Sequence, residues 1–171
     1  DVHLKPDYRL VEFERAIEVL KEVVAAEGDY AARDRALYEL AWAYRDADRG
    51  AEATKTFGQL AQQFPQSPFA AEGHYRVGES LYDEKQWPEA IAQFRAAATA
   101  KQGEPTLREK GLHMVAWSEL KQGEAEKAAA SFAEQVKAFP EGPLAADDKW
   151  MRGEALYEAG KYEPAIDAYA A

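Results

Sequence analysis

Histidine and carboxylate side chains can act as metal ligands or as general acids and bases. The chain of 171 residues contains 3 histidines and 31 Asp and Glu residues. His74 and His113 lie 39 positions apart, and no third ligand follows at the spacing of a metal site. Cysteine is absent, which excludes disulfides, thiol catalysis and Cys-based zinc sites. We therefore expect no metal ion and no cofactor.

The sequence motifs of common catalytic sites are also missing. There is no G-x-S-x-G, no H-E-x-x-H, no phosphate-binding loop and no Ser-His-Asp order. Glu79 and Glu154 occupy matching places 75 residues apart. That separation is far for a glycosidase pair, whose carboxyl groups lie about 5–10 Å apart. We predict that the protein is not an enzyme and that these two carboxylates make polar contacts.

The histidine and carboxylate side chains are positioned by a sequence repeat with a period of 37 or 38 residues. Three columns of aromatic or small residues keep this period: Phe57, Phe94, Phe132 and Tyr169; Ala53, Ala90, Ala128 and Ala165; Ala41, Gly78, Ala116 and Gly153. Apolar residues within each repeat recur at helical spacing on two segments. One helical hairpin cannot bury its apolar stripe alone, so hairpins of this kind stack on one another.

The pattern predicts an all-α chain with one leading helix and four helical hairpins. The expected ranges are 7–26 for the leading helix, then 30–45 with 51–64, 68–84 with 88–101, 105–121 with 124–139, and 143–159 with 163–171. Gly123 and Gly160 are expected as left-handed caps between paired helices, with Asp48 and Lys85 in the same column. Asp29 is the expected N-cap of the helix that follows it.

Prolines are expected to open the first helix of three hairpins. Pro68, Pro105 and Pro143 recur with the repeat, and Ser67 precedes the first of them as an N-cap. The residues that begin at these prolines are predicted to add about one turn to each first helix.

Composition and charge narrow the range of partners. The formal net charge is −10 and the pI is near 4.9, which argues against nucleic acid and against anionic lipid. No apolar run is long enough to cross a membrane. We expect one domain over residues 1–171, and the start at Asp1 suggests a fragment of a longer protein.

The repeat resembles the tetratricopeptide repeat, whose pattern is W-x2-L-G-x2-Y, then A-x3-F, then Pro. Leu37, Leu40, Ala41 and Tyr44 match the first part, and Ala53, Phe57 and Pro65 the rest; the next copy reads Val77, Gly78, Leu81, Ala90 and Phe94. The resemblance implies a right-handed α-α superhelix of about four and a half hairpins. The long period and the phrases around Pro68 and Pro143 are similar to bacterial cell-envelope members, of the outer-membrane assembly lipoprotein and Tol–Pal accessory types. A periplasmic or envelope location is therefore expected.

The resemblance also implies that ligands bind the concave face, beside the packing columns of the first helices. The residues at those places are Arg35, Tyr38, Trp42, Arg45, Tyr75, Glu79, Tyr82, Lys110, His113, Trp117, Lys121, Trp150, Glu154 and Tyr157. Tyr and Trp combine a large contact area with a polar group, which suits a peptide groove. The competing interpretation is that several of these rings pack between successive first helices and never contact a ligand.

The leading hypothesis is a protein-interaction scaffold that binds a partner segment with these aromatic residues. In it, Arg35, Arg45, Lys110 and Lys121 would hold acidic groups of the ligand. The alternative is a peptidoglycan-binding module in which the same rings stack on sugars. A hydrolase built from helical hairpins ranks far below both, because such toroids need more hairpins than this chain contains. Self-association through uncapped ends of the solenoid is a further expectation.

Overall fold

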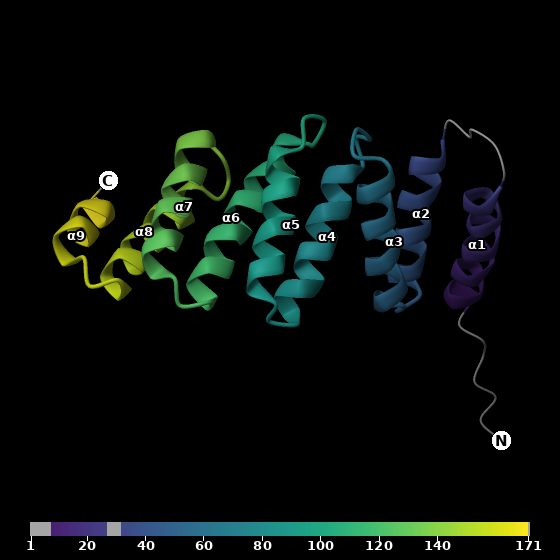
Figure 1. The fold of residues 1–171 in the computed structure, drawn as a ribbon, viewed down its shortest axis with the longest axis horizontal. Helices are drawn as coiled ribbons and strands as arrows, with labels where there is room; N and C mark the ends of the chain where they lie inside the picture. Colours follow the sequence, from purple (N-terminus) through teal and green to yellow (C-terminus); the bar gives the residue numbers. More distant parts are fainter. Residues whose placement is uncertain (1–7, 27–31, 171) are drawn as a thin grey trace, which may run out of the picture.

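The computed structural model describes residues 8–26 and 32–170, with side chains from residue 11 onward. The described residues form helices and connecting turns, without a strand. The helices are α1 (Tyr8–Ala25), α2 (Arg33–Asp46), α3 (Gly50–Gln63), α4 (Ala70–Asp83), α5 (Trp87–Thr99), α6 (Pro105–Lys121), α7 (Ala125–Ala138), α8 (Ala145–Glu158) and α9 (Tyr162–Ala170). They stand in a single row from one end of the molecule to the other (Figure 1). The predicted all-α solenoid is confirmed. Asp29, the expected N-cap, lies outside the described residues.

The repeating columns form the core of each hairpin. Phe57, Phe94 and Phe132 expose 1% or less of their surface, and the small residues opposite them are also buried. A Cβ atom added to Gly78 would lie 2.7 Å from the Phe94 ring, closer than real contacts allow. The small residue is therefore required where the two helices of the hairpin approach each other.

The turns within the hairpins share one left-handed geometry. Asp48, Lys85, Gly123 and Gly160 have φ values of 60°, 62°, 86° and 73°. In each turn the next residue donates its N–H to a carbonyl five positions earlier, for example Glu124 to Glu119 at 2.9 Å. This bond is typical of a Schellman cap. The prediction of left-handed caps in this column is confirmed.

The prediction that prolines lengthen the first helices is wrong at two of three positions. Only α6 begins at its proline, Pro105. Pro68 and Pro143 lie in turns before α4 and α8, whose N-cap residues are Phe69 and Leu144. Ser67 accepts a hydrogen bond from the Phe69 N–H at 3.1 Å and donates one to Asp34. These bonds fix a turn at the position where a helical turn was expected.

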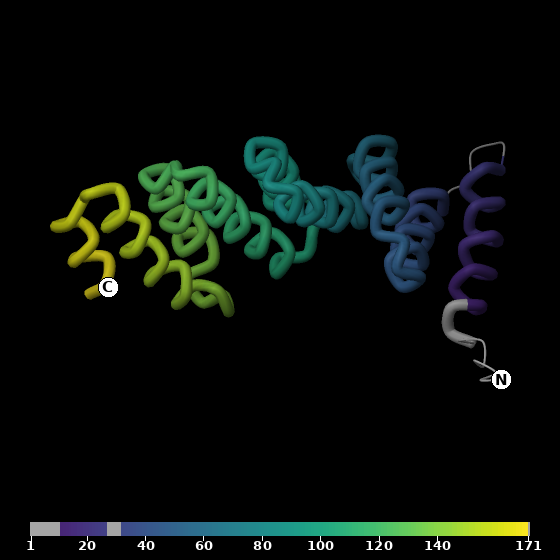
Figure 2. Tube along the Cα trace, turned by 90° about the horizontal axis from the view of Figure 1, so that it is seen from below, coloured from purple at the N-terminus to yellow at the C-terminus, as the bar shows by residue number. Residues whose placement is uncertain are grey.

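Each helix contacts the next one along the chain, so hairpins stack in sequence order. The first helices α4 and α6 also contact each other directly. Figure 2 shows from a second direction that the helix axes change their tilt along the row. We call the surface formed by α2, α4, α6 and α8 the first-helix face. None of the helices in the described ranges has the length and apolar character to span a bilayer.

Candidate binding groove on the first helices

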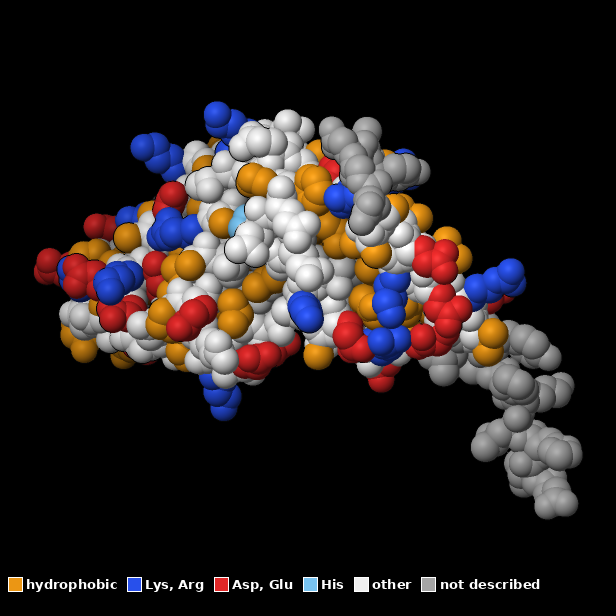
Figure 3. All heavy atoms as spheres, turned by 45° about the vertical axis from the view of Figure 1, so that its right-hand side comes forward, with side chains coloured by type: hydrophobic (Ala, Val, Ile, Leu, Met, Phe, Trp, Pro, Cys, Tyr) orange, Lys and Arg blue, Asp and Glu red, His pale blue; other side chains and the backbone are white. Residues whose placement is uncertain are grey.

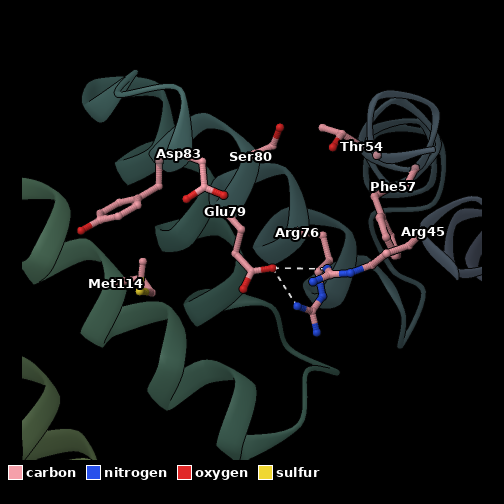
Figure 4. A pocket seen from close by; sticks show the side chains of 11 residues that line it. Arg45, Thr54, Phe57, Arg76, Glu79, Ser80, Asp83 and Met114 are labelled. Atoms are coloured by element: carbon pink, nitrogen blue, oxygen red, sulfur yellow. Dashed lines mark hydrogen bonds and ion pairs between the residues drawn. The ribbon is translucent and has the colours of Figure 1, made fainter. Parts of the chain in front are cut away.

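Two neighbouring hollows lie on the first-helix face and share Arg76 and Glu79. One has a volume of about 420 Å³ and the other of about 430 Å³. The first, drawn in Figure 4, is lined by Arg45, Gly50, Ala53, Thr54, Phe57, Arg76, Glu79, Ser80, Tyr82, Asp83 and Met114. The second is lined by Tyr38, Pro68, Phe69, Glu72, Tyr75, Arg76, Glu79, Gln102, Glu104, Thr106, Leu107 and Lys110. We call the two hollows together the groove. Its walls come mainly from α4. In the first hollow α3 adds four residues, and in the second α6 and the turns before α4 and α6 add most of the rest, with one residue of α2 in each hollow.

Arg76 is the central charged group of the groove. Its Nε donates to Glu72 Oε1 and its Nη1 to Glu79 Oε2, both at 2.7 Å. Glu79 also pairs with Arg45 at 3.6 Å, so both arginines converge on it (Figure 4). Burial acts to lower the pKa of Arg76, but the hydrogen bonds and charges of Glu79 and Glu72 outweigh it and raise the pKa. The guanidinium therefore stays charged and fixed between two carboxylates.

Aromatic rings line the groove or lie directly behind Arg76. The guanidinium carbon of Arg76 lies 4.9 Å from the centre of the Trp42 ring, within the range of a cation–π interaction. Tyr38 stacks on Phe69 with ring centres 4.5 Å apart. Tyr75 exposes only 8% of its surface, and burial raises its pKa to about 12. The neutral phenol is thus the stable form in this wall.

The structure gathers six of the predicted site residues around the groove: Tyr38, Arg45, Tyr75, Glu79, Tyr82 and Lys110 line it. Trp42 lies behind this lining, edge-on to Phe57 at 5.6 Å and covered by Arg76. Arg35 is not brought to the groove. It is exposed on α2 and pairs with Glu39.

The predicted residues of α6 beyond the groove are engaged by neighbouring side chains. His113 Nδ1 lies 2.6 Å from Asp148 Oδ1. Trp117 packs edge-on against Phe132, and Lys121 lies 5.9 Å from the centre of the Trp117 ring. Burial raises the pKa of Asp148, although the hydrogen bond with His113 acts to lower it. The ring contacts favour the packing interpretation for Trp117, whereas His113 is held by Asp148.

On α8, the predicted residues Trp150, Glu154 and Tyr157 lie outside the groove. Trp150 exposes 57% and Tyr157 61% of the residue surface. The Tyr169 hydroxyl donates to Glu154 at 2.7 Å, and the Tyr169 ring lies against Trp150. Tyr157 packs on Tyr162. These rings form a second aromatic area near the end of the row.

Several groove residues were not predicted from the sequence. They include Arg76, Phe69, Thr54, Leu107 and Met114. The spacing of Glu72, Arg76 and Glu79 was a usable signal, because residues three and four apart are neighbours on a helix. Phe69 and Leu107 carried no such signal, because their place depends on how the turns before α4 and α6 fold.

The surface around these features carries charges of both signs. In the face drawn in Figure 3, basic and acidic side chains lie next to each other with hydrophobic ones between them. Among the residues that line the groove, three are cationic (Arg45, Arg76 and Lys110) and four are acidic (Glu72, Glu79, Asp83 and Glu104). The groove is therefore close to neutral, with one acidic charge in excess.

Comparisons with known proteins agree with this architecture. A family model described as the tetratricopeptide repeat matches residues 8–68, 38–105 and 114–171. The structure of a Podosopora anserina putative kinesin light chain with nearly identical TPR-like repeats is similar at a TM-score of 0.65 and 18% identity, over 94% of this chain and 85% of that one. The structure of MamA is similar at a TM-score of 0.68 and 17% identity, over 99% and 93% of the two chains. No curated protein matches. With the family model covering most of its residues, this chain belongs to the tetratricopeptide repeat family.

Proposed function

We propose that the protein is an interaction scaffold that binds a segment of a partner protein in the groove. The observation that carries this proposal is the continuity of the two hollows across Arg76 and Glu79. Each hollow has the volume of a site for a few side chains. A segment that crosses Arg76 would place successive side chains in both.

The groove favours a partner with cationic as well as apolar side chains. Arg45 and Arg76 are already neutralised by glutamates of the chain itself. Three charged groups of the lining have no ion-pair partner among the described residues: Asp83, Glu104 and Lys110. Two of these are acidic, so a Lys or Arg of the partner gains more there than an Asp or Glu does. This differs from the expectation that arginines of the scaffold hold acidic groups of the ligand.

The experiment begins by selecting twelve-residue peptides from a random displayed library on the purified protein. We expect enrichment of peptides that combine aromatic residues with Lys or Arg. The double variant Asp83→Lys with Glu104→Lys should weaken the selected peptides by roughly tenfold, since each exposed ion pair contributes up to about 1 kcal/mol. Asp83 and Glu104 are exposed, so the variant should keep its helicity.

A matched double variant, Glu89→Lys with Glu163→Lys, makes the same change in net charge on α5 and α9, away from the groove. It should bind the peptides as the parent does. Equal binding by all three proteins would refute a groove-bound cationic segment.

Glycan binding is the competing function, and the exposed rings of Trp150 and Tyr157 favour it. Sugars stack on open aromatic faces, whereas Tyr38 and Trp42 are already covered by Phe69 and Arg76. Titration with peptidoglycan fragments, read by tryptophan fluorescence, separates the two functions. A response that is lost in Trp150→Ala would support glycans. The envelope location stays a prediction.

Self-association is proposed for the outer faces of α1 and α9. Val11 and Val19 expose 58% and 55% of their surface on α1, and Ile166 exposes 66% on α9. Apolar exposure of this kind favours contact between molecules. Light scattering at two concentrations should show a mass that increases with concentration and returns to the monomer value in Ile166→Lys. A constant monomer mass would refute this.

A further inference from the structure

A buried polar cluster lies between the third and fourth hairpins, and three of its members occupy columns that hold small, apolar or aromatic residues in the other hairpins. Asp148 is in the column of Ala36, Gly73 and Gly111. Gln135 is in the column of Leu60 and Ala97, and His113 is in the column of Tyr38, Tyr75 and Trp150. All other members of the first two columns are buried. The repeat itself therefore shows that packing does not require these polar residues.

The cluster joins α6, α7 and α8. His113 Nδ1 lies 2.6 Å from Asp148 Oδ1, and Asp148 is fully buried. One turn earlier on α6, buried Glu109 accepts hydrogen bonds from the Gln135 side chain and the Leu144 N–H, both at 3.0 Å. Two buried oxygens, Asp148 Oδ2 and Gln135 Oε1, have no hydrogen-bond partner among the described residues.

The cluster thus contains more buried acceptors than donors. A buried oxygen without a donor costs free energy, so native proteins supply it with a proton, a water molecule or a cation. The exposed carboxylate of Asp147 is adjacent to the buried one of Asp148. One ligand atom each of His113, Asp147 and Asp148 lies within 4.8 Å of the others. Ligand atoms of a four-coordinate zinc ion are roughly 3–4 Å apart, so a small adjustment brings this set to a metal ion.

We propose that His113, Asp147 and Asp148 bind one divalent transition-metal ion of the Zn²⁺ type. An imidazole suits zinc and its neighbours in the periodic table, and two carboxylates balance the ion's charge. Asp147 faces solvent, so water can complete the coordination. Glu109 and Gln135 support the site by fixing the helices on which its ligands lie. The bound ion would join α6 to α8 across the two hairpins.

The test uses Zn²⁺ for calorimetry and Co²⁺ for visible absorption, with the full chain. We expect one ion per chain with a dissociation constant in the micromolar range. Asp147→Asn and His113→Tyr, which restores the aromatic residue of the other hairpins, should each weaken binding by tenfold or more. Asp148→Gly restores the residue of two other hairpins and should do the same. Zn²⁺ should raise the melting temperature of the parent but not of these three variants.

His74→Ala is the matched control. His74 lies in the second hairpin, is partly buried and is hydrogen-bonded to Gln93 of the same hairpin. It is therefore remote from the proposed site, and its loss should leave the affinity unchanged. If Asp148→Gly does not fold, Asp147→Asn still tests whether the metal ion binds, because the Asp147 side chain is exposed and contributes little to packing. The proposal is overturned if no saturable binding occurs, or if Asp147→Asn and His113→Tyr bind Zn²⁺ as tightly as the parent.

Discussion

Two helical glycines should respond in opposite ways to the same substitution, because only one of them contacts a neighbouring backbone. A Cβ atom at Gly73 of α4 would lie 2.8 Å from the Phe57 carbonyl oxygen on α3 and 3.3 Å from the Ala61 Cβ. The carbonyl belongs to the helix backbone and cannot rotate away. A Cβ at Gly58 would meet only the Val77 side chain, at 3.7 Å, which is an ordinary contact.

The magnitudes follow from these contacts. Replacing Gly by Ala inside a helix stabilises it by about 1 kcal/mol, and this is the full expected effect of Gly58→Ala. Gly73→Ala gains the same amount but must separate α3 from α4, and such overpacking costs about 1–3 kcal/mol. We expect a net loss of about 1 kcal/mol for Gly73→Ala. The two variants should then differ by about 2 kcal/mol, or about 4–8 °C in melting temperature.

Urea unfolding followed by circular dichroism, together with thermal melting, measures both variants against the parent. In a solenoid, stability is a sum of hairpin and nearest-neighbour contributions, so the effect of Gly73→Ala reports on the contact between α3 and α4. If Gly73→Ala stabilises the protein as much as Gly58→Ala does, the close approach at Phe57 is absent and the reasoning fails.

Three further predictions use the same columns and turns. Phe94→Ala should lower the free energy of unfolding by about 3–5 kcal/mol because Phe94 is fully buried, whereas Tyr169→Ala in the same column, 37% exposed, should cost much less; equal losses in urea unfolding would contradict this. Lys85→Gly should stabilise the protein by about 0.5–1 kcal/mol, since Lys85 has φ = 62° and glycine adopts that geometry freely; a lower melting temperature would contradict it. Burial raises the pKa of Tyr75 from 10.0 to about 12, so the neutral phenol stabilises the folded protein fully below pH 10, and this stabilisation is lost as the pH rises toward 12. Tyr75→Phe should remove this part of the pH dependence of the free energy of unfolding.

Much of the fold could be predicted from the sequence because the 37- or 38-residue repeat brings residues of the same type to the same packing position in each hairpin. The column of Phe57, Phe94 and Phe132 and the small residues opposite it are buried as expected. The left-handed turns could be predicted even at Asp48 and Lys85, which are not glycines, because they share a column with Gly123 and Gly160. Periodicity identifies these positions even when the residue type does not.

The loops before the first helices were harder to predict, because local side-chain bonds compete there with the helix. Ser67 holds the turn before α4 by bonding the Phe69 N–H and Asp34, so Pro68 does not begin the helix. The sequence suggested a proline at the first helical position, which occurs only at Pro105. The bond to Asp34 joins residues 33 positions apart, which a local pattern does not reveal.

The sequence indicated which side chains of the first helices lie near one another, but not how they pair; that they bind a partner stays a prediction. The first helices do present Tyr38, Tyr75 and Glu79 to one groove. The sequence did not indicate that Arg76 would be fixed between Glu72 and Glu79 or that His113 would pair with Asp148. Such pairs depend on the distance between neighbouring helices, which the repeat pattern alone does not specify.

The central claim is that the first-helix face binds a partner segment, and backbone amide chemical shifts test it most directly. The isotope-labelled protein is titrated with the peptide that the selection enriches most. We predict that the largest shift changes fall on α4, around Arg76 and Glu79, and on the lining residues of α2, α3 and α6, with few on α5 and α7. Changes that fall mainly on α5 and α7, or on no helix at saturating peptide, would contradict the proposed groove.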